Sequence, residues 1–362
     1  MRYDAVVVGN GPAGSLSAIH GSRLNEVAIV GQRERKAECA GLISKSGLER
    51  MSVKPGGFVV NKIRGAKIYS PSGVEIVVDG GETKAYAVDR LGFDNHLLDS
   101  AIDSGARFIE GWATSAKGGI ALKSGKTVET GKTILATGTD YTLHTRLGID
   151  KPSEFLIGGQ YEMKVECDQD FVELYFNVPD FFSWIIPIGD TARVGLCVKS
   201  NPRPYLESFI KKLEKEGRIK STVKQSETFG IIPLHRPTMR TQYPGIITVG
   251  DAAGQVKAST GGGIVFGGIC AKFACEDDYE KKWKAMIGND LRIHLMIHRV
   301  LNQLNDKGKD RLFRIIGEHH SSLERAGDMD LAGKTITGML KDPGLLSKTM
   351  FNLPWLLADL IL

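Results

Sequence analysis

Residues 3–14 read YDAVVVGNGPAG, so a short apolar stretch runs directly into three glycines with the spacing GxGxxG (Gly9, Gly11 and Gly14). The apolar stretch is typical of a buried strand, and the residues after Gly14 have a helical pattern. A second apolar stretch, residues 27–30, follows within one helix length. This strand–helix–strand order is the context in which GxGxxG binds a dinucleotide, so the sequence predicts such a site near its amino-terminal end.

Each of the three glycines has a separate physical task in such a turn. Gly9 permits the tight turn, Gly11 lets the backbone approach a pyrophosphate, and Gly14 lets the helix pack closely on the strand. The pyrophosphate then lies at the positive end of the helix. The alternative interpretation is a glycine loop that only begins a helix and holds no ligand.

The composition is that of an ordinary globular protein, because 42% of the 362 residues are apolar and 25% are charged. This length predicts about two domains. A net charge of +5 without an aromatic-studded basic stripe does not indicate nucleic-acid binding. Five cysteines without a CxxC pair favour neither a zinc site nor a disulfide framework, and we expect no metal site. Since we find no signal peptide and no run of 18 apolar residues, we expect a cytoplasmic protein.

Features of a dinucleotide site occur in two separated parts of the chain. An apolar strand pattern at residues 246–249 precedes GDAAG (250–254), and residues 158–198 between the two parts alternate like antiparallel strands. Shorter elements are expected as a hairpin (119–122 and 126–129), a separate strand (132–138) and a helix (204–216). The expected divisions are 1–60, 88–140 and 240–275 for a dinucleotide-binding domain, 61–87 and 141–239 for an inserted sheet domain, and 276–362 for a helical carboxyl-terminal region.

Several motifs, quoted in chain order, carry a resemblance to a known family. They are GNGPAG (9–14), ECAGLIS (38–44), VDRLGFD (88–94), ATG (136–138), PDFFSWIIP (179–187), GDAAG (250–254) and TGGGI (260–264). From residue 1 to about residue 275 the chain resembles the FAD-dependent geranylgeranyl reductases, particularly the archaeal digeranylgeranylglycerophospholipid reductase-like enzymes that saturate prenyl chains of ether lipids. The resemblance implies an α/β fold of the p-hydroxybenzoate-hydroxylase type, with a Rossmann-like FAD-binding domain, an inserted antiparallel-sheet substrate domain and a helical carboxyl-terminal region.

The resemblance implies FAD as the cofactor. Asp251 would accept hydrogen bonds from ribityl hydroxyls, and Arg90 would bind a phosphate bidentately. Backbone N–H groups at residues 261–263 would face the flavin edge that becomes negative on reduction. The residues that match the family's FAD contacts are Gly9, Gly11, Ala13, Gly14, Cys39, Ala40, Leu42, Arg90, Ala113, Asp251, Gly262, Gly263 and Ile264.

Two positions depart from the family's pattern. Such folds usually end the second strand with an acid that binds the adenosine ribose, where this chain has Gly31, so Gln32 or Glu34 would have to substitute. The family's pocket motif usually carries tyrosine where this chain has Phe182, so any role of that hydroxyl is lost.

The resemblance also implies the reaction, which is hydrogenation of isoprenoid (geranylgeranyl) double bonds in a lipid. An isolated alkene has no carbonyl group to absorb the charge of a hydride, so we expect proton-led addition in a dry pocket with electron-rich walls. The implied substrate-binding residues are Phe181, Phe182, Trp184 and Pro187, and the implied catalytic residues are Cys39 and Trp184. The alternatives are ordinary core packing for the aromatic residues and, for Cys39, a small apolar contact with the flavin.

Only one dinucleotide fingerprint is present, so electrons would come either from transient docking of NAD(P)H or from a small redox carrier. His235 is interpreted either as a proton relay or as part of a polar surface turn. His294 and His298 have the i,i+4 spacing of metal ligands but lack the glutamate of HExxH.

The last twelve residues, 351–362, are strongly apolar and too short to span a bilayer. One interpretation is an interfacial anchor, aided by Lys334, Lys341 and Lys348, that makes peripheral contact with the inner face of the membrane. The other is a helix that caps the substrate tunnel or packs on a partner.

Two other functions also fit the sequence. A flavin monooxygenase of an aromatic or polyprenyl compound would consume NAD(P)H in an oxygen-dependent reaction. A non-catalytic lipid-binding or electron-relay flavoprotein would expose the edge of its flavin to solvent.

Overall fold

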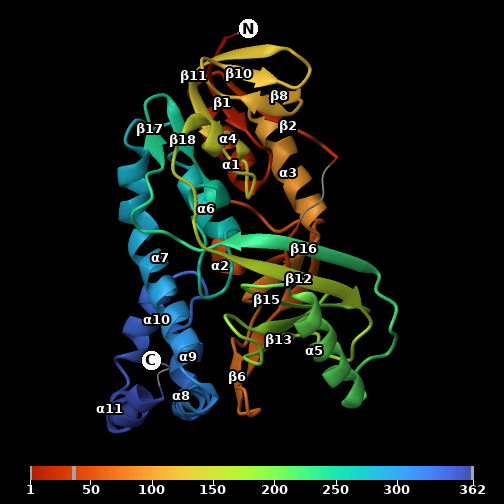
Figure 1. Cartoon of the computed structure of the whole chain (residues 1–362), viewed down its shortest axis with the longest axis vertical. Coiled ribbons are helices and arrows are strands. Elements are labelled where there is room, and N and C mark those ends of the chain that lie inside the picture. The colour runs from red at the N-terminus through yellow and green to blue at the C-terminus, as the bar shows by residue number, and fades with distance from the viewer. Residues whose placement is uncertain (1, 35–37, 360–362) are drawn as a thin grey trace.

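The computed structural model describes residues 2–34 and 38–359. Figure 1 shows an elongated molecule with a mainly parallel sheet and its helices at one end and an antiparallel sheet at the other. Helices of the carboxyl-terminal region run along one side and end beside the antiparallel sheet. The predicted α/β fold, with an inserted sheet and a helical carboxyl-terminal region, is confirmed.

The first sheet is built around strand β1. Its strands in spatial order are β17 (Gln242–Tyr243), β18 (Ile246–Thr248), β11 (Thr127–Leu135), β1 (Arg2–Val8), β2 (Val27–Gly31) and β8 (Arg107–Glu110), with β9 (Ala113–Ser115) and β10 (Ile120–Leu122) joined to β11. The pairs from β18 to β8 are all parallel. The carboxyl ends of β1, β11 and β18 therefore meet at one edge, which is where ligands bind in sheets of this kind.

Three helices pack together on this sheet. They are α1 (Pro12–Gly21), α3 (Arg90–Asp103) and α6 (Ile264–Ala271). Leu16, Phe93 and Phe266, one from each helix, are buried in a single apolar core with Val7 of β1. Burial of these side chains fixes the start of α1 at the carboxyl edge of β1.

The turn between β1 and α1 has no room for a side chain at two positions. A Cβ atom on Gly14 would lie 1.9 Å from the carbonyl oxygen of Gly9. A Cβ atom on Gly9, whose φ is +107°, would lie 2.2 Å from the carbonyl oxygen of Ala136. Gly14 therefore packs the helix against the strand, which is the task expected of it.

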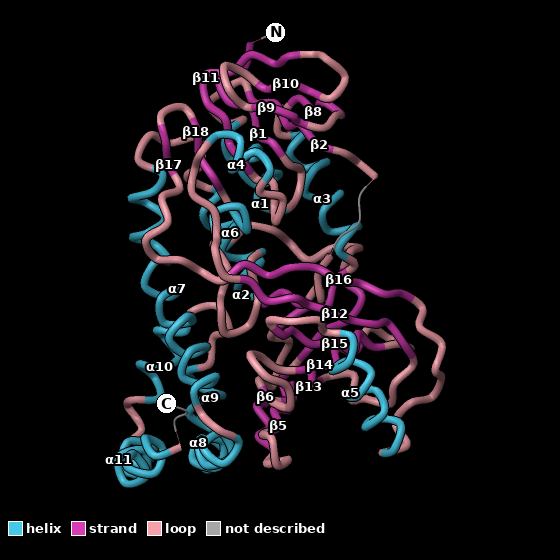
Figure 2. The backbone as a smooth tube through the Cα atoms, viewed as in Figure 1, coloured by secondary structure: helices cyan, strands magenta, loops and turns pink. Residues whose placement is uncertain are grey.

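The second sheet is antiparallel except for one pair, β13 with β5. Its order is β16 (Ser226–Pro233), β12 (Phe155–Met163), β15 (Ala192–Val198), β14 (Ser183–Pro187), β13 (Phe171–Tyr175), β5 (Gly65–Tyr69) and β6 (Glu75–Asp79). Helix α5 (Arg203–Lys215) lies beside one face of this sheet, as Figure 2 shows. Its side chains Leu206, Phe209 and Leu213 are buried against that face. The opposite face, with Trp184 and Ile186, lines a cavity.

A small sheet joins the two large ones. It consists of β3 (Leu42–Ser44), β7 (Ala85–Val88) and β4 (Val59–Ile63), and α2 (Lys45–Arg50) follows β3. Ile43 and Val88 belong to the core of the first sheet, whereas Ile63 and Ala87 belong to the apolar cluster around Trp184. The small sheet thus contributes to both cores.

The carboxyl-terminal region is helical. It contains α7 (Tyr279–Gln303), α8 (Asp306–Glu318), α9 (His320–Ala326), α10 (Ala332–Met339) and α11 (Pro343–Ala358). Trp283 of α7 is buried in the first core and Leu295 in the cluster around Trp184, so this long helix also spans both parts. Among the described residues, none of the helices has both the length and the apolar character needed to cross a membrane.

Two boundaries differ from those expected. β11 is one nine-residue strand that includes the second arm of the predicted hairpin and the start of the strand predicted at 132–138. Helix α4 (Thr142–Leu147) lies within the range 141–239 that we expect for the inserted domain, and it packs on the first sheet. The reason is that Leu143, Leu147 and Ile149 complete the apolar cluster around Val8.

Alanine at position 14 should destabilise the fold, because its methyl group has to displace the backbone of Gly9. We expect Gly14→Ala to lower the free energy of unfolding by about 1–3 kcal/mol, the usual cost of overpacking. The matched control is Gly288→Ala in α7, where the nearest atom to the added Cβ is 3.6 Å away and alanine stabilises the helix by up to about 1 kcal/mol. Denaturant unfolding followed by circular dichroism compares them, and wild-type stability of Gly14→Ala would contradict the packing described.

Candidate functional site

A cavity of about 1610 Å³ lies between the carboxyl edge of the first sheet and the inner face of the second. Its wall includes the β1–α1 turn, the loop before β3, the glycine turn before α6 and aromatic side chains in β14 and just before it. Small-molecule sites usually enclose about 300–1,000 Å³. This cavity therefore has room for two bound molecules, of which one is large.

The β1–α1 turn forms one end of the cavity. Residues 9–13 line it, and Gly11, which precedes α1, has no side chain to cap the helix. The N–H groups of the first helical turn therefore lie at the positive end of the helix dipole without a capping side chain, an arrangement that favours an anion such as pyrophosphate. Gly14 lies outside the wall and acts through packing.

The structure explains why glycine, and not the usual acidic residue, stands at position 31. Asn10 Nδ2 donates a hydrogen bond to the carbonyl oxygen of Gln32 at 3.0 Å, and Gln32 N donates to Asn10 Oδ1 at 3.3 Å. A Cβ atom on Gly31 would lie 2.3 Å from Asn10 Oδ1. Because the asparagine occupies the place of an acidic side chain, the position has to be glycine. Gln32 lines the cavity, whereas Glu34 is not part of its wall.

The loop that carries Cys39 is held by side chains of the second sheet. Gln160 Nε2 donates to the carbonyl oxygen of Cys39 at 3.2 Å. Arg193 donates to the carbonyl oxygens of Ala40 and Val88 at 2.8 and 3.0 Å, and burial lowers the pKa of its guanidinium. The sequence motif around Cys39 indicates neither tie, because Gln160 and Arg193 come from strands more than 100 residues later.

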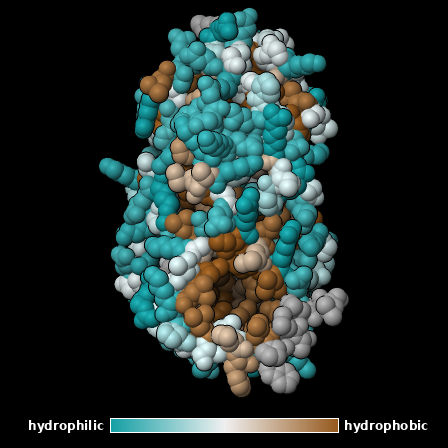
Figure 3. Space-filling view, turned by 90° about the vertical axis from the view of Figure 1, so that its left-hand side faces the viewer, coloured by the Kyte–Doolittle hydropathy of each residue, from teal (hydrophilic) through white to brown (hydrophobic). Residues whose placement is uncertain are grey.

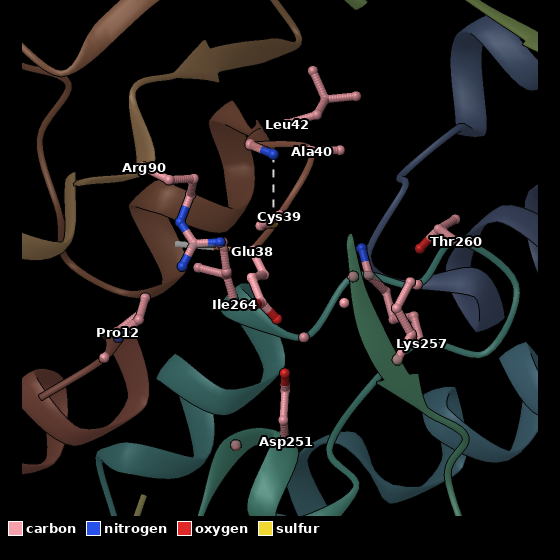
Figure 4. A pocket seen from close by; sticks show the side chains of 18 of the residues that line it. Pro12, Glu38, Cys39, Ala40, Leu42, Arg90, Asp251, Lys257, Thr260 and Ile264 are labelled. Carbon is pink, nitrogen blue, oxygen red and sulfur yellow. Dashed lines mark hydrogen bonds between the residues drawn. The ribbon is translucent and has the colours of Figure 1, made fainter. Parts of the chain in front are cut away.

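Figure 4 shows Arg90, Cys39, Asp251 and Ile264 around a common space. Desolvation raises the pKa of Asp251, and the Arg90 guanidinium opposes this shift. Burial disfavours the charge of Arg90 itself, whereas Cys39 and Asp94 favour it, and the pKa of the guanidinium is raised overall. Asp94, four residues later on α3, pairs with Arg90 at 3.2 Å through both of its oxygens. The guanidinium is thus directed at a carboxylate, where we expected a bidentate phosphate contact.

The other end of the cavity is apolar and aromatic. The rings of Phe181 and Phe182 stack with centroids 4.1 Å apart, and Phe182 meets Trp184 edge-on at 6.4 Å. All three side chains line the cavity and are only 7 or 8% exposed. Aliphatic residues complete this part of the wall, namely Ala66, Ile68, Val172, Leu174, Ile186 and Ile232. We refer to this end as the aromatic chamber, and its surface suits a hydrocarbon.

Pro187 does not line the aromatic chamber. Side chains alternate between the two faces of a strand. Trp184 and Ile186 of β14 face the cavity, so Pro187 shares the opposite face with Ile185, which is buried in the cluster under α5. Pro187, which we expected to contact the substrate, therefore lies on the face of β14 that points away from the chamber.

A polar row crosses the second sheet at the wall of the chamber. Gly195 of β15 pairs with Gln160 of β12 on one side and with Trp184 of β14 on the other. A Cβ atom on Gly195 would lie 2.5 Å from the Trp184 ring and 2.6 Å from Gln160 Cβ, so glycine lets these side chains approach. Trp184 Nε1 and Gln160 Oε1 are buried, and neither has a hydrogen-bond partner within the described part of the chain. A buried donor or acceptor without a protein partner usually pairs with an ordered water molecule.

Two histidines that we considered as a proton relay or a metal ligand, His235 and His294, are buried and contact other polar groups of the chain. His235 is buried, not on a surface turn, and its Nδ1 lies 3.0 Å from the carbonyl oxygen of Gly254. Burial lowers its pKa. His294 lies 2.6 Å from Ser259 Oγ, and burial lowers its pKa to about 4. Within the described ranges no three His, Cys, Asp or Glu side chains are grouped as metal ligands.

The cavity wall brings together nearly all of the site residues expected from the sequence. They are Gly9, Gly11, Ala13, Cys39, Ala40, Leu42, Arg90, Ala113, Phe181, Phe182, Trp184, Asp251, Gly262, Gly263 and Ile264. Gly14 and Pro187 lie outside it.

Known proteins resemble this chain along nearly its whole length, although no protein-family model matches it. The sequence is 30% identical to digeranylgeranylglycerophospholipid reductase 2 of Methanothermobacter thermautotrophicus, over 90% of this chain and 94% of that protein. It is 29% identical to the digeranylgeranylglycerophospholipid reductase of Methanocaldococcus jannaschii, over 87% of this chain and 91% of that protein.

Solved structures share the fold. A geranylgeranyl bacteriochlorophyll reductase-like protein of Thermoplasma acidophilum superposes with a TM-score of 0.81 at 23% identity, covering 97% of this chain and 99% of that one. A flavin-dependent brominase superposes with a TM-score of 0.68 at 18% identity, covering 98% and 99%. Together with the near full-length sequence similarity to the curated reductases, these findings show that the chain belongs to the digeranylgeranylglycerophospholipid reductase family.

Proposed function

We propose that the chain is an FAD-dependent reductase that hydrogenates the isoprenoid (geranylgeranyl) double bonds of a lipid. The observation that carries the proposal is a single cavity with a dinucleotide-type turn at one end and the aromatic chamber at the other. A large polar cofactor and a hydrocarbon chain can therefore be bound side by side. The names of the relatives, reductases of digeranylgeranyl lipids, support the same substrate class.

The residues at the polar end fit FAD. The tight turn that Gly9 permits and the uncapped start of α1 suit the pyrophosphate. Gln32, which lines the cavity where β2 ends, is the candidate for the adenosine ribose. Asp251 and the glycine turn at 261–263 also line the cavity, so Asp251 would accept hydrogen bonds from the ribityl chain and the turn would border the flavin ring. When bound and reduced, FAD supplies the hydride for the alkene.

An isolated double bond gives the chamber three tasks: to exclude water, to stabilise positive charge on the tertiary carbon and to deliver a proton. Phe181, Phe182 and Trp184 serve the first two. Their buried rings keep the chamber dry, and each aromatic face stabilises a nearby cation by about 0.5–2 kcal/mol.

Cys39 is the candidate that holds the proton, at its Sγ atom. The residue lies on the cavity wall, Gln160 fixes its carbonyl group, and its Sγ accepts a hydrogen bond from Gly41 N at 3.4 Å. The other amide atom of Gln160, Oε1, is buried without a hydrogen-bond partner in the described part of the chain, so it can accept a hydrogen bond from a water molecule near the Cys39 loop. After each turnover the thiolate would recover one proton from bulk solvent, and such a water would relay it.

In this proposal the lipid enters from a membrane surface next to the carboxyl-terminal helices. Helix α11 exposes Leu346, Met350, Phe351 and Leu353, and Phe351 is 80% exposed. Figure 3 shows apolar side chains gathered around a hollow on the face formed by these helices. An apolar helix face of this kind inserts into the boundary between headgroups and acyl chains. Residues 360–362 of the predicted anchor lie outside the described residues.

The central test is an anaerobic single turnover. The purified protein should bind one FAD per chain, and mixing its dithionite-reduced form with a digeranylgeranyl lipid should reoxidise the flavin. Mass spectrometry should then find two hydrogen atoms added to the lipid for each flavin reoxidised. Dithionite makes the result independent of whether NAD(P)H or a small redox carrier is the physiological donor.

Other outcomes of this test contradict the proposal in distinguishable ways. Oxygen-dependent consumption of NAD(P)H with an oxygenated product would identify a monooxygenase. Bound FAD without any change in the lipid would identify a binding or electron-relay protein. A protein that stays colourless with excess FAD would contradict the cofactor.

Replacement of Cys39 by alanine should slow turnover with little change in FAD content, because the site loses its proton donor. The usual contribution of a positioned general acid is about 10²–10⁴-fold in rate. Cys167→Ala is the matched control, since Cys167 lies outside the cavity wall. Stopped-flow reoxidation of the reduced flavin measures both, and an unchanged rate in Cys39→Ala would remove the thiol from the reaction.

Serine in place of Met350 and Phe351 should weaken binding to anionic phospholipid vesicles, because the apolar contact is lost. Turnover of detergent-dispersed lipid should stay at the wild-type rate. The matched control is Leu24→Ser in the turn after α1, where the side chain is 91% exposed. Vesicle flotation compares the variants, and undiminished flotation of the double variant would contradict a membrane role for α11.

A further inference from the structure

A buried ion pair lies against the glycine turn before α6. Lys257 is 3% exposed, and Asp330, from the segment between α9 and α10, has no exposed surface. Lys257 Nζ is 2.5 Å from Asp330 Oδ1 and 3.1 Å from the carbonyl oxygen of Met329. Because desolvation offsets most of its Coulomb energy, a buried pair is weak evidence for stability. The position of Lys257 in the cavity wall says more about function than the pair says about stability.

Both the backbone and the side chain of Lys257 contact the glycine turn. Its N–H donates to the carbonyl oxygen of Gly262 at 3.1 Å, and its carbonyl oxygen accepts from Gly261 N at 2.8 Å. A Cβ atom on Gly262 would lie 2.8 Å from Lys257 Cε and 3.2 Å from Nζ. Figure 4 shows the side chain beside this turn, and Lys257 and residues 261–263 all line the cavity. A positive charge is therefore fixed where the turn meets the cavity.

The surroundings of Lys257 leave its charge almost balanced. Asp330 also lies 3.5 Å from Arg50, and Arg50 pairs with Asp328 at 2.7 Å. His294 Nε2 lies 3.0 Å from the carbonyl oxygen of Asp330 and belongs to an imidazole that is neutral at neutral pH. Two cations and two anions thus form one cluster. Within it, Asp330 is the anion that directly offsets Lys257.

We propose that Lys257 is a positioning residue that favours the reduced state of the flavin, and that Asp330 limits the strength of this effect. The inference rests on the proposed function, in which the turn at 261–263 faces the edge of the flavin. NAD(P)H would supply two electrons and one proton as a hydride, whereas a small redox carrier would supply the two electrons and solvent the proton; either route leaves one negative charge on that edge. A cation held in a wall of low dielectric constant binds the negative form more tightly than the neutral one.

This arrangement also couples the flavin to the carboxyl-terminal region. Asp330 belongs to the segment that leads into α10, so its bond to Lys257 ties that segment to the glycine turn. A reduced flavin competes with Asp330 for the same ammonium group. If reduction of the flavin weakens the contact between this segment and Lys257, then release of the segment must favour reduction of the flavin. By thermodynamic linkage the two effects have the same free energy.

The test is a redox titration of the holoenzyme and three variants, of which Lys257→Met and Asp330→Asn remove one charge each with little change in shape. Lys257→Met should bind reduced FAD at least tenfold less well relative to oxidised FAD, which is a midpoint potential about 30 mV more negative for a two-electron couple. Asp330→Asn should shift the potential in the opposite direction, because the ammonium group is no longer offset. Lys257→Arg, which keeps the charge, should stay close to wild type.

Arg218→Met is the control for the loss of an ion pair that is at least partly buried. Arg218 pairs with Glu173 at 2.7 Å, and neither residue lines the cavity. Its potential should equal that of the wild type even though the protein is less stable. A merely structural role for Lys257 would give the same result in Lys257→Met.

Each outcome decides the inference. Unchanged potentials, or shifts of Lys257→Met and Asp330→Asn in the same direction, would overturn it. If Lys257→Met does not fold, Asp330→Asn decides alone, and its potential has to rise. If the wild-type protein binds no FAD, the proposed function is contradicted instead. If the wild-type protein binds FAD and reduces lipid but the variants have the same potential as the wild type, only this inference is contradicted.

Discussion

The close approach of α1 to β1 constrains where the rest of the protein places a ligand. The backbone of Gly14 lies against that of Gly9, and Gly9 lies against Ala136, so the start of α1 is fixed at the carboxyl edge of the first sheet. Because β11 and β18 pair in parallel with their neighbours, Asp251 and the glycine turn before α6 reach the same edge. The polar end of the cavity is therefore a consequence of parallel strand pairing.

The second sheet supplies the apolar end, and specific ties hold the two ends together. Gln160 and Arg193 reach from this sheet to the backbone around Cys39, so the thiol loop is placed by the substrate wall as well as by its own domain. Asp330 makes a comparable tie from the carboxyl-terminal region to Lys257. Three distant parts of the chain thus meet at one cavity.

The fold and most of the site could be predicted because their signals are local. The glycine spacing at 9–14 and the aromatic run at 181–184 each act within a few residues. Period-two alternation along β14 could also have shown that Pro187 faces away from Trp184, and the i,i+4 spacing of Arg90 and Asp94 could have indicated their ion pair.

Other features depend on tertiary structure and have no local signal. Gln160 and Trp184 become neighbours only through the register of three strands, with Gly195 between them. The Lys257–Asp330 pair depends on how the carboxyl-terminal helices dock.

The most direct measurement is a crystal structure of the protein with FAD and a geranylgeranyl lipid. This account predicts the flavin ring at the glycine turn 261–263 and a prenyl chain against Phe182 and Trp184, whereas a flavin ring open to water, or a lipid bound elsewhere, would contradict it.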